Sequence, residues 1–461
     1  MSAAPRRFEL DPSVHRWDGG RLLVGGTPPR LVRLSEAGAA ALDAVLAGDP
    51  GGGEAEALVR RLERHGLLHP LPDPGAAEPE VTTVVPVLDG GEPLGRLVRT
   101  LAAEGPVIVV DDGSGDGSGA RAAAAGARVI ANTGRRGPAG ARNTGLRAAR
   151  TEIVAFLDAD CTVAPGWRAG LAALLVADPE LALIAPRVRS APGGSALARY
   201  EERASPLDLG PHPSLVGTDR RIAYLPSAAL LGRRDALLAV DGFDEFLRYG
   251  EDVDLVWRLL VAGRLARYAP AREVSHEPRP TPASMARQRA GYGGAAPDLA
   301  LRHGDLAAPL TVGPHAAAVW AAVLALGPLA LPPALATSLA VVAARGEDRD
   351  SRLALADVAL RGHVTAARHL ARALTREWLP LALLAAGPSR RARRLLLAAF
   401  LADTLPLCRR APRDAPATAA LRALDHAAYA AGLWRRSLRL RTTAALRPRV
   451  LSPSDPSRAG R

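Results

Sequence analysis

Four apolar runs decide the fold: VTTVVPV (81–87), VIVV (107–110), RVIA (128–131) and IVAFL (153–157). Stretches with helical patterning separate these runs, at 93–104, 120–126 and 139–150. Runs that are apolar on both faces and alternate with helices are typical of strands in a parallel sheet with helices on either side. The sequence therefore predicts an α/β fold with a Rossmann-like parallel sheet in the middle of the chain.

Three acidic clusters lie at or near the ends of predicted strands, where ligands bind in open α/β sheets. Asp111-Asp112 ends the second run, Asp158-Ala159-Asp160 ends the fourth, and Glu251-Asp252-Val253-Asp254 follows Gly250. Each cluster also has a simpler explanation. The first could cap a helix, and the second could lie in a solvated loop. The third could start a helix, since acidic residues favour the first turn. Three such clusters together favour a binding site instead.

Asp158 and Asp160 present two carboxylates of the kind that binds a hard divalent cation together with a diphosphate. The glycines at 113, 115, 117 and 119 do not form the G-x-G-x-x-G pattern of a dinucleotide site. The sequence therefore predicts a metal–diphosphate site rather than a dinucleotide cofactor.

With these motifs in place, residues 81–277 resemble the family-2 glycosyltransferases of GT-A fold. The matching motifs arrive in the family's order: Val85-Pro86, Val110-Asp111-Asp112-Gly113-Ser114, Gly137-x-x-Gly140-Ala141-Arg142-Asn143-x-Gly145, Phe156-Leu157-Asp158-Ala159-Asp160, Asp241-Gly242-Phe243-Asp244-Glu245 and Gly250-Glu251-Asp252-Val253-Asp254. The resemblance implies a nucleotide-sugar donor, a divalent metal (Mn²⁺ or Mg²⁺) and an inverting reaction.

The same resemblance implies roles for single residues. Asp252 would be the general base, with Glu251 as the second choice, because a carboxylate there can take the proton of an acceptor hydroxyl. Asp160 would bind the metal and His276 would be a third ligand, which neutral imidazole suits. The remaining residues implied in substrate binding are Pro86, Asp111, Asp112, Arg142, Asn143, Asp158, Asp244 and Arg289.

Arg289 lies where processive relatives carry a Gln-x-x-Arg-Trp acceptor motif, and here that tryptophan is absent. The resemblance therefore does not extend to the motif with which those synthases retain a growing glucan.

Residues 1–75 form a separate part of the sequence. Two apolar runs (22–24 and 30–34) joined by a Gly/Pro turn predict a hairpin, and helices follow at 35–46 and 55–65, the first with Ser35 as N-cap. A hairpin with such helices fits a winged helix, but 9 arginines against 10 acids give no basic surface for nucleic acid. The segment resembles the PqqD-like domains that bind a precursor peptide by strand addition. The alternative is a structural cap.

The C-terminal region carries the positive charge, with 23 arginines and 9 acids in residues 345–461. Residues 306–344 contain no charged side chain, so they predict either two short membrane-crossing helices or an alanine-rich helical hairpin. Apolar patches at 379–386 and 395–407 are flanked by arginines, which suits attachment to an anionic membrane surface.

Two features bear on the compartment. The two cysteines, Cys161 and Cys408, have no C-x-x-C partner, and the N-terminus lacks the apolar segment of a signal peptide. We expect a cytoplasmic protein at the inner face of the cell membrane.

The predicted division is therefore a peptide-recognition domain (1–75), a GT-A catalytic domain (76–300) and a helical, arginine-rich region (301–461). This order is similar to that of the glycosyltransferases of mycofactocin biosynthesis. The similarity implies transfer of glucose from UDP-glucose to premycofactocin, a peptide-derived redox cofactor, in β-1,4-linked chains. A polyprenyl or cell-wall lipid acceptor and a non-catalytic recognition scaffold are the alternatives.

Overall fold

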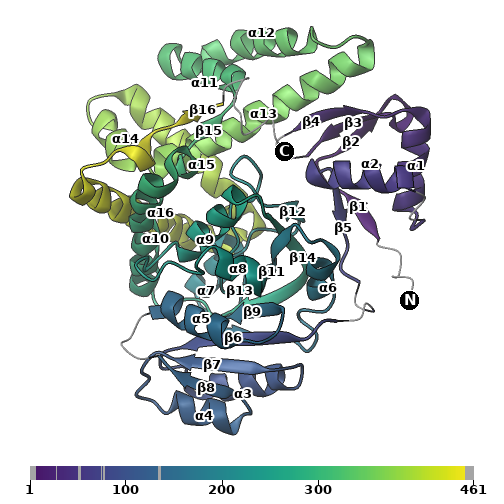
Figure 1. Cartoon of the computed structure of the whole chain (residues 1–461). Coiled ribbons are helices and arrows are strands. Elements are labelled where there is room, and N and C mark those ends of the chain that lie inside the picture. The colour runs from purple at the N-terminus through teal and green to yellow at the C-terminus, as the bar shows by residue number, and fades with distance from the viewer. Residues whose placement is uncertain are drawn as a thin grey trace. The chain divides into compact units, whose positions relative to one another are not determined.

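The computed structural model describes residues 7–26, 29–49, 53–73, 75, 78–132 and 137–451. The contacts divide the chain into two compact units. One comprises Met1–Glu9 and His69–Pro282, and the other Leu10–Leu68 and Ala283–Arg461. A large mixed sheet forms the centre of the first unit, and helices predominate in the second (Figure 1).

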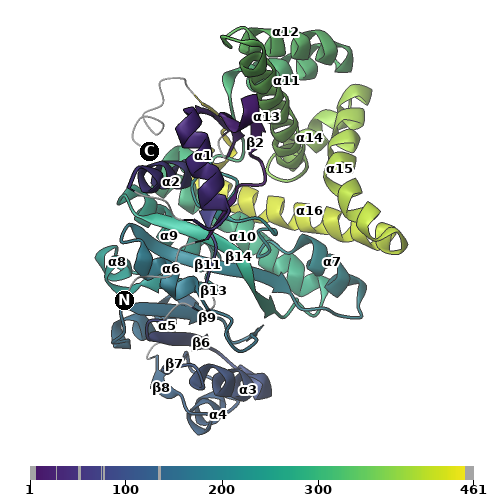
Figure 2. The ribbon, with the colours of Figure 1, turned by 90° about the vertical axis from the view of Figure 1, so that its right-hand side faces the viewer.

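The central sheet has nine strands among the described residues. Their bounds are β6 (Val81–Val87), β7 (Val107–Asp111), β8 (Arg128–Ala131), β9 (Ile153–Leu157), β10 (Cys161–Thr162), β11 (Leu181–Ser190), β12 (Ser214–Leu215), β13 (Ala229–Arg233) and β14 (Leu265–His276). The order is β10-β14-β11-β13-β9-β6-β7-β8, with β12 beside β14. Figure 2 shows the strands of this sheet from β14 to β8.

The prediction of a parallel sheet is confirmed for β6, β7, β8 and β9. It is wrong for the sheet as a whole, because β13 runs antiparallel to both β9 and β11. The four apolar runs follow one repeating pattern, whereas the later strands follow connections of other lengths, and β13 enters the sheet in the opposite direction. The fold class remains α/β.

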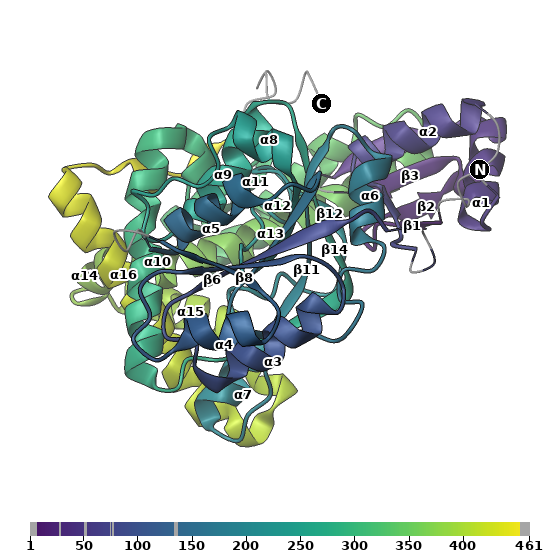
Figure 3. The same cartoon turned by 60° about the horizontal axis from the view of Figure 1, so that its bottom comes forward.

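Helices cover both faces of this sheet: α3 (Gly91–Ala102), α4 (Ser118–Ala124), α5 (Gly137–Ala148), α6 (Leu171–Ala177), α7 (Ala196–Ala204), α8 (Arg234–Ala239) and α9 (Glu251–Val261). Helices α3, α4 and α6 share one apolar core with alternate strand residues such as Val85 and Ala155. Helix α5 packs on the other face, where α8 and α9 also lie (Figure 3). Because side chains alternate along a strand, each face receives every second residue.

Helix α5 lies very close to strand β6. A Cβ atom at Gly145 would collide with the side chain of Val84, so only glycine permits this approach. The close packing fixes α5, and with it the Arg142-Asn143 pair one turn earlier, against the sheet.

The second unit begins with a small α+β module. Its elements are the three-stranded antiparallel sheet β2 (His15–Trp17), β3 (Leu22–Gly25) and β4 (Arg30–Arg33), and the helices α1 (Glu36–Leu46) and α2 (Gly53–Arg64). The predicted hairpin pairs as expected, and the Ser35 hydroxyl accepts a hydrogen bond from the Gly38 amide as N-cap. Strands β1 (Phe8–Leu10) and β5 (Leu68–Pro70) pair with each other in a separate two-stranded sheet.

Seven helices form the rest of the second unit in the described chain: α10 (Pro282–His303), α11 (Pro314–Leu326), α12 (Leu331–Ala343), α13 (Arg349–Thr375), α14 (Leu379–Ala386), α15 (Arg390–Arg410) and α16 (Ala415–Leu440). Short 3-10 turns and the strand pair β15 (Thr311–Val312) and β16 (Arg449–Val450) connect them.

The uncharged segment 306–344 contains α11 and α12, which have 13 residues each. Helices of this length reach about 20 Å, less than the ~30 Å apolar core of a bilayer. Across the described residues, no helix has both the length and the apolar character needed to cross a membrane. The alternative of two crossing helices is therefore wrong for this segment.

The N-terminal module contacts helix α13 within its unit. Leu22 and Val24 of β3 pack against Ala354, and the Arg33 guanidinium bonds Asp348 (3.0 Å) and Ser351 (2.7 Å). No local pattern in the sequence indicates this contact, because the partners are more than 300 positions apart.

Candidate active site

The D-x-D pair lies at the carboxyl end of β9. The Asp158 amide donates to the carbonyl of Ala228, which continues the pairing between β9 and β13 past the last strand residue. Both aspartates remain partly exposed there. Asp158 and Asp160 therefore lie at the carboxyl end of a strand, as the sequence predicts.

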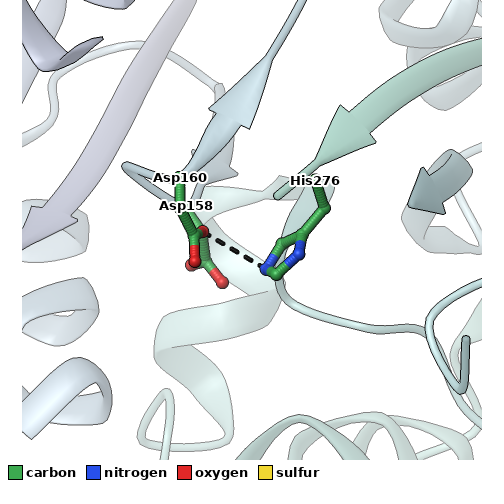
Figure 4. Close-up of side chains that lie close together, drawn as sticks. All are labelled: Asp158, Asp160 and His276. Atoms are coloured by element: carbon green, nitrogen blue, oxygen red, sulfur yellow. Dashed lines mark ion pairs between the residues drawn. The ribbon is translucent and has the colours of Figure 1, made fainter. Parts of the chain in front are cut away.

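His276 reaches this pair through strand register. Strand β10 pairs antiparallel with β14, and the register sets Cys161 opposite His276. The imidazole Nε2 then lies 3.2 Å from Asp160 Oδ1 (Figure 4). Ligand atoms of Asp158, Asp160 and His276 all lie within 4.8 Å of one another.

The donor set suits a divalent cation, because two carboxylate oxygens and one imidazole nitrogen are ligands that Mn²⁺ accepts. Burial alone would raise the pKa of Asp160, but the hydrogen bond and charge of His276 and the charge of Arg279 outweigh it and lower this pKa. Burial would likewise lower the pKa of His276, and Asp160 more than reverses that. The His276 imidazole and the Asp160 carboxylate thus pair with each other at the position where both could bind a metal ion.

Arg142 links the D-x-D pair to the acidic motif of α9. Its guanidinium donates to Asp158 Oδ1 (2.6 Å) and to Glu251 Oε1 (2.9 Å), and only 3% of the side chain is exposed. It also lies over the ring of Phe243, with 5.5 Å from Cζ to the centroid. One buried cation therefore joins two acidic groups that are almost a hundred positions apart.

Glu251 and Asp252 begin helix α9 and have different surroundings. Burial, followed by the neighbouring charge of Asp252, raises the pKa of Glu251 to about 7, although Arg142 opposes the shift. Burial also raises the pKa of Asp252, against hydrogen bonds from the amides of Ser227 and Val253. Glu251 is buried and held by Arg142, whereas Asp252 keeps partial exposure. Glu251 is thus engaged in an ion pair, whereas Asp252 is bonded by two backbone amides.

Asn143 holds the loop before α9. Its amide nitrogen donates to the carbonyl of Phe243 (2.7 Å) and to Glu245 (3.1 Å), and its Oδ1 accepts from the Phe243 amide (2.8 Å). Gly242 has φ +64°, and a Cβ there would meet Asn143 Oδ1. The side-chain groups of Asn143 are thus engaged within the protein, and its contact with substrate stays a prediction.

The residues predicted to bind the donor nucleotide lie at the ends of β6 and β7. Pro86 is paired in register with Val110. Asp111 Oδ1 accepts from the amides of Gly113 and Ser114 and so shapes the turn after β7. Asp112 is buried and accepts from Asn132 (2.6 Å) and from the amide of Gly137 (3.0 Å). Nucleotide binding by these residues stays a prediction.

Two further residues predicted to bind substrate, Asp244 and Arg289, belong to different units. Asp244 accepts from the Phe246 amide in the loop before α9. Arg289 belongs to the other unit, where it is buried and pairs with Asp425 of α16 (3.2 Å). A substrate contact of either residue stays a prediction.

Two contacts at the site were missed from the sequence. Arg279 Nη2 lies 3.1 Å from Asp160 Oδ2, and the Ser227 amide donates to Asp252. For Arg279 the available signal was its position three residues after His276. For Ser227 there was none, because a backbone amide carries no sequence signature.

Comparisons with known proteins agree with this geometry. Residues 82–236 match the model of glycosyl transferase family 2. The chain is 39% identical to the pre-mycofactocin glycosyltransferase of two Mycobacterium tuberculosis strains, across 96% of this chain and 97% of the relative. The chain belongs to this family of glycosyltransferases. Their GT-A fold accounts for the mixed sheet.

More distant similarities involve smaller parts of the sequence or lower structural agreement. A succinoglycan biosynthesis protein of Rhizobium meliloti is 34% identical over 40% of this chain and 57% of its own length. A mannosyltransferase from Pyrobaculum calidifontis, solved with GDP-Man and Mn²⁺, has a TM-score of 0.45 and 21% identity, over 87% of this chain and 99% of its own. The glycosyltransferase assignment rests on the family model and the mycobacterial relatives.

In this glycosyltransferase, replacing Arg142 with methionine is expected to destabilise the fold by about 3 kcal/mol, because removing one partner of a buried ion pair strands the other charges. We take the lower end of the usual range since 27% of the Asp158 side chain is exposed. Denaturant unfolding in chelator measures the effect without metal compensation. Arg147→Met, on the same helix but 56% exposed, is the control. Equal stability of the two variants would contradict the structural role of Arg142.

Proposed function

We propose that this enzyme is an inverting, metal-dependent transferase that moves glucose from UDP-glucose onto premycofactocin and builds β-1,4-linked glucose chains. The observation that carries the chemistry is the joint geometry of the site. The triad Asp158, Asp160 and His276 connects through Arg142 to Glu251, and Asp252 follows Glu251 at the start of α9. The relative's name supports the acceptor.

The proposed reaction is a single displacement. Asp252 takes the proton of the acceptor hydroxyl as its oxygen bonds to the anomeric carbon. The bond from that carbon to the nucleoside diphosphate breaks on the opposite face, so the configuration inverts. A divalent cation, when bound by Asp158, Asp160 and His276, supplies positive charge for the departing diphosphate.

The residues around Asp252 prepare it for this role. The amides of Ser227 and Val253 fix the carboxylate, and its raised pKa makes it a better proton acceptor than an ordinary aspartate. Arg142 holds Glu251 in an ion pair, which leaves Asp252 as the carboxylate at the start of α9 without a paired cation among the described residues. Arg279, beside Asp160, adds a second positive charge near the expected diphosphate.

Mass spectrometry of reaction products tests the proposal. Purified enzyme, Mn²⁺, UDP-glucose and premycofactocin should yield a series of products that differ by one hexose each, and digestion by a β-1,4-specific glucosidase should remove them. Parallel reactions with GDP-mannose and UDP-N-acetylglucosamine test the donor. If hexose is added to a polyprenyl phosphate and not to premycofactocin, premycofactocin is rejected as the acceptor. If no acceptor receives a sugar, the result favours the non-catalytic recognition scaffold.

The polyprenyl or cell-wall lipid acceptor remains the second candidate. The observation that favours it is the exposed apolar surface of the second unit, where α14 and α15 keep several leucines in solvent. We also propose that the enzyme acts at the inner face of the cell membrane, because arginines flank these apolar segments.

We propose that the module at residues 1–75 is PqqD-like and presents the acceptor to the catalytic domain at 76–300. Deleting the module should spare slow hydrolysis of UDP-glucose and raise the KM for a peptide-derived acceptor. It should also lower stability, because Leu22 and Val24 cover Ala354 of α13. Steady-state kinetics on both reactions, after a thermal unfolding check, separates these effects.

The control for this deletion is Arg33→Ala. It removes the bonds to Asp348 and Ser351 while leaving the module in place. If the enzyme without the module has an unchanged KM for the acceptor, the module does not recognise the acceptor. The alternative role as a structural cap then stands.

A further inference from the structure

Helices α14 and α15 expose large apolar side chains to solvent. Leu397, Leu401 and Leu405 follow one another at four-residue spacing along α15, so they lie along one side of the helix. In α14, Leu381, Leu383 and Leu384 are also exposed. Across the two helices the exposed fraction runs from 42% at Leu405 to 74% at Leu384. A helix on a globular protein usually turns such a stripe toward the core.

Helices α14 and α15 pack against each other, and the start of α15 is bonded to the ends of two neighbouring helices. The Arg393 guanidinium donates to the carbonyls of Ala386 and Gly387 at the end of α14. Arg391 donates in the same way to the carbonyls of Val323 and Ala325 at the end of α11. Figure 2 shows α15 beside α14, at the outer side of these helices. We call the exposed side of α14 and α15 the leucine face.

Positive charge borders the leucine face. Arg390 and Arg394 are exposed at the start of α15 and have no ion pair in the described part of the chain, and Arg409 and Arg410 are exposed at its end. Cations at a helix N-terminus oppose the helix dipole, so the fold alone gives no reason for Arg390 and Arg394.

Negative charge is absent from this face. Asp403 is the one acid in residues 379–410. Both its oxygens bond Arg422 of α16, at 2.6 and 3.0 Å, and only 14% of its side chain is exposed. The face therefore combines apolar side chains with unneutralised arginines.

We propose that the leucine face rests on an anionic bilayer surface. The leucines would enter the boundary between headgroups and acyl chains, and the arginines at both ends would lie against lipid phosphates. Helix α15, with 21 residues, is about 30 Å long and would lie in the plane of the surface. The inference deepens the proposed membrane location and is independent of the proposed chemistry.

Charge decides between a bilayer and a second copy of the chain. In a symmetric dimer the same surface meets itself. Two leucine faces would bring the arginines of one α15 close to those of the other, with no acid on the face to pair them. An anionic bilayer supplies the missing negative charge.

Co-sedimentation of the full-length protein with lipid vesicles tests the proposal. Wild-type protein should bind phosphatidylglycerol/phosphatidylethanolamine vesicles at least tenfold more strongly than phosphatidylcholine vesicles, and salt should weaken this binding. The variant with Leu397→Ser, Leu401→Ser and Leu405→Ser should lose binding at least tenfold. The variant Arg390→Gln with Arg394→Gln should lose the preference for anionic vesicles.

The matched control is Leu360→Ser with Leu438→Ser, two exposed leucines of α13 and α16 outside the face. It should bind as wild type does. Circular dichroism and thermal unfolding establish that each variant folds, and activity on a water-soluble acceptor should be equal in all of them. If the wild-type protein shows no activity on that acceptor, the proposed chemistry is rejected, but the proposed membrane contact of the leucine face is not.

Two results would overturn the proposal. One is equal vesicle binding by wild type and the triple leucine variant. The other is a dimer of wild type in sedimentation velocity, without lipid, that the triple variant abolishes, since this would assign the face to a second copy.

Discussion

Asp252→Asn is expected to lower kcat by about a hundredfold or more, the usual effect of removing a general base. Asparagine keeps the shape of the side chain, and its oxygen can still accept from the Ser227 amide, but it cannot take a proton. Binding of the nucleotide should survive. Steady-state kinetics together with calorimetry of UDP binding separates the two effects.

Glu251→Gln is the matched comparison, because it changes the neighbouring acid in the same way. If Glu251→Gln is crippled while Asp252→Asn is active, the base is Glu251. The pH profile gives a second check. The base acts only when deprotonated, so activity should fall as pH drops, and at a higher pH than an ordinary aspartate would give, since the pKa of Asp252 is raised.

Asp158→Ala or Asp160→Ala is expected to reduce transfer about a thousandfold or more, since a catalytic metal contributes several kcal/mol of charge stabilisation. EDTA should inhibit the wild-type enzyme, and Mn²⁺ or Mg²⁺ should restore it. Both variants should also lose affinity for Mn²⁺, measured directly by calorimetry with UDP present.

Full turnover in chelator would contradict metal dependence. Asp160→Asn is a useful companion because it keeps the shape while removing the charge that pairs with His276 and Arg279. Glu92→Gln, an exposed carboxylate change on α3, is the control. Loss of activity with unchanged Mn²⁺ affinity in the aspartate variants would assign them to substrate rather than metal.

Local patterns in the sequence already determined much of this protein. The apolar runs at β6 and β9 have the predicted bounds, because a buried strand needs a nearly unbroken run of apolar residues. The run at β8 also has the predicted bounds, although this strand is at the edge of the sheet and partly exposed. Helix α1 starts after Ser35 as predicted, since an N-cap acts over a few residues. The order of the motifs indicated the glycosyltransferase family, which the comparisons confirm.

The candidate metal triad was named from the sequence by resemblance, but its geometry is a tertiary result. His276 meets Asp160 because β10 and β14 pair in one register, and register depends on packing across the whole sheet. The reversed direction of β13 and the bridge from Arg142 to Asp158 and Glu251 follow from the same long-range packing.

The second unit shows the same limit. Hydrophobic patterning located the apolar patches at 379–386 and 395–407, which lie in α14 and α15. It did not tell which side of these helices is covered, because that depends on which other helices pack there. The association of the N-terminal module with α13 is likewise a contact between distant segments. The sequence determined the elements and the acidic motifs through interactions between near neighbours, whereas the tertiary structure decided which distant residues meet and which apolar faces stay exposed.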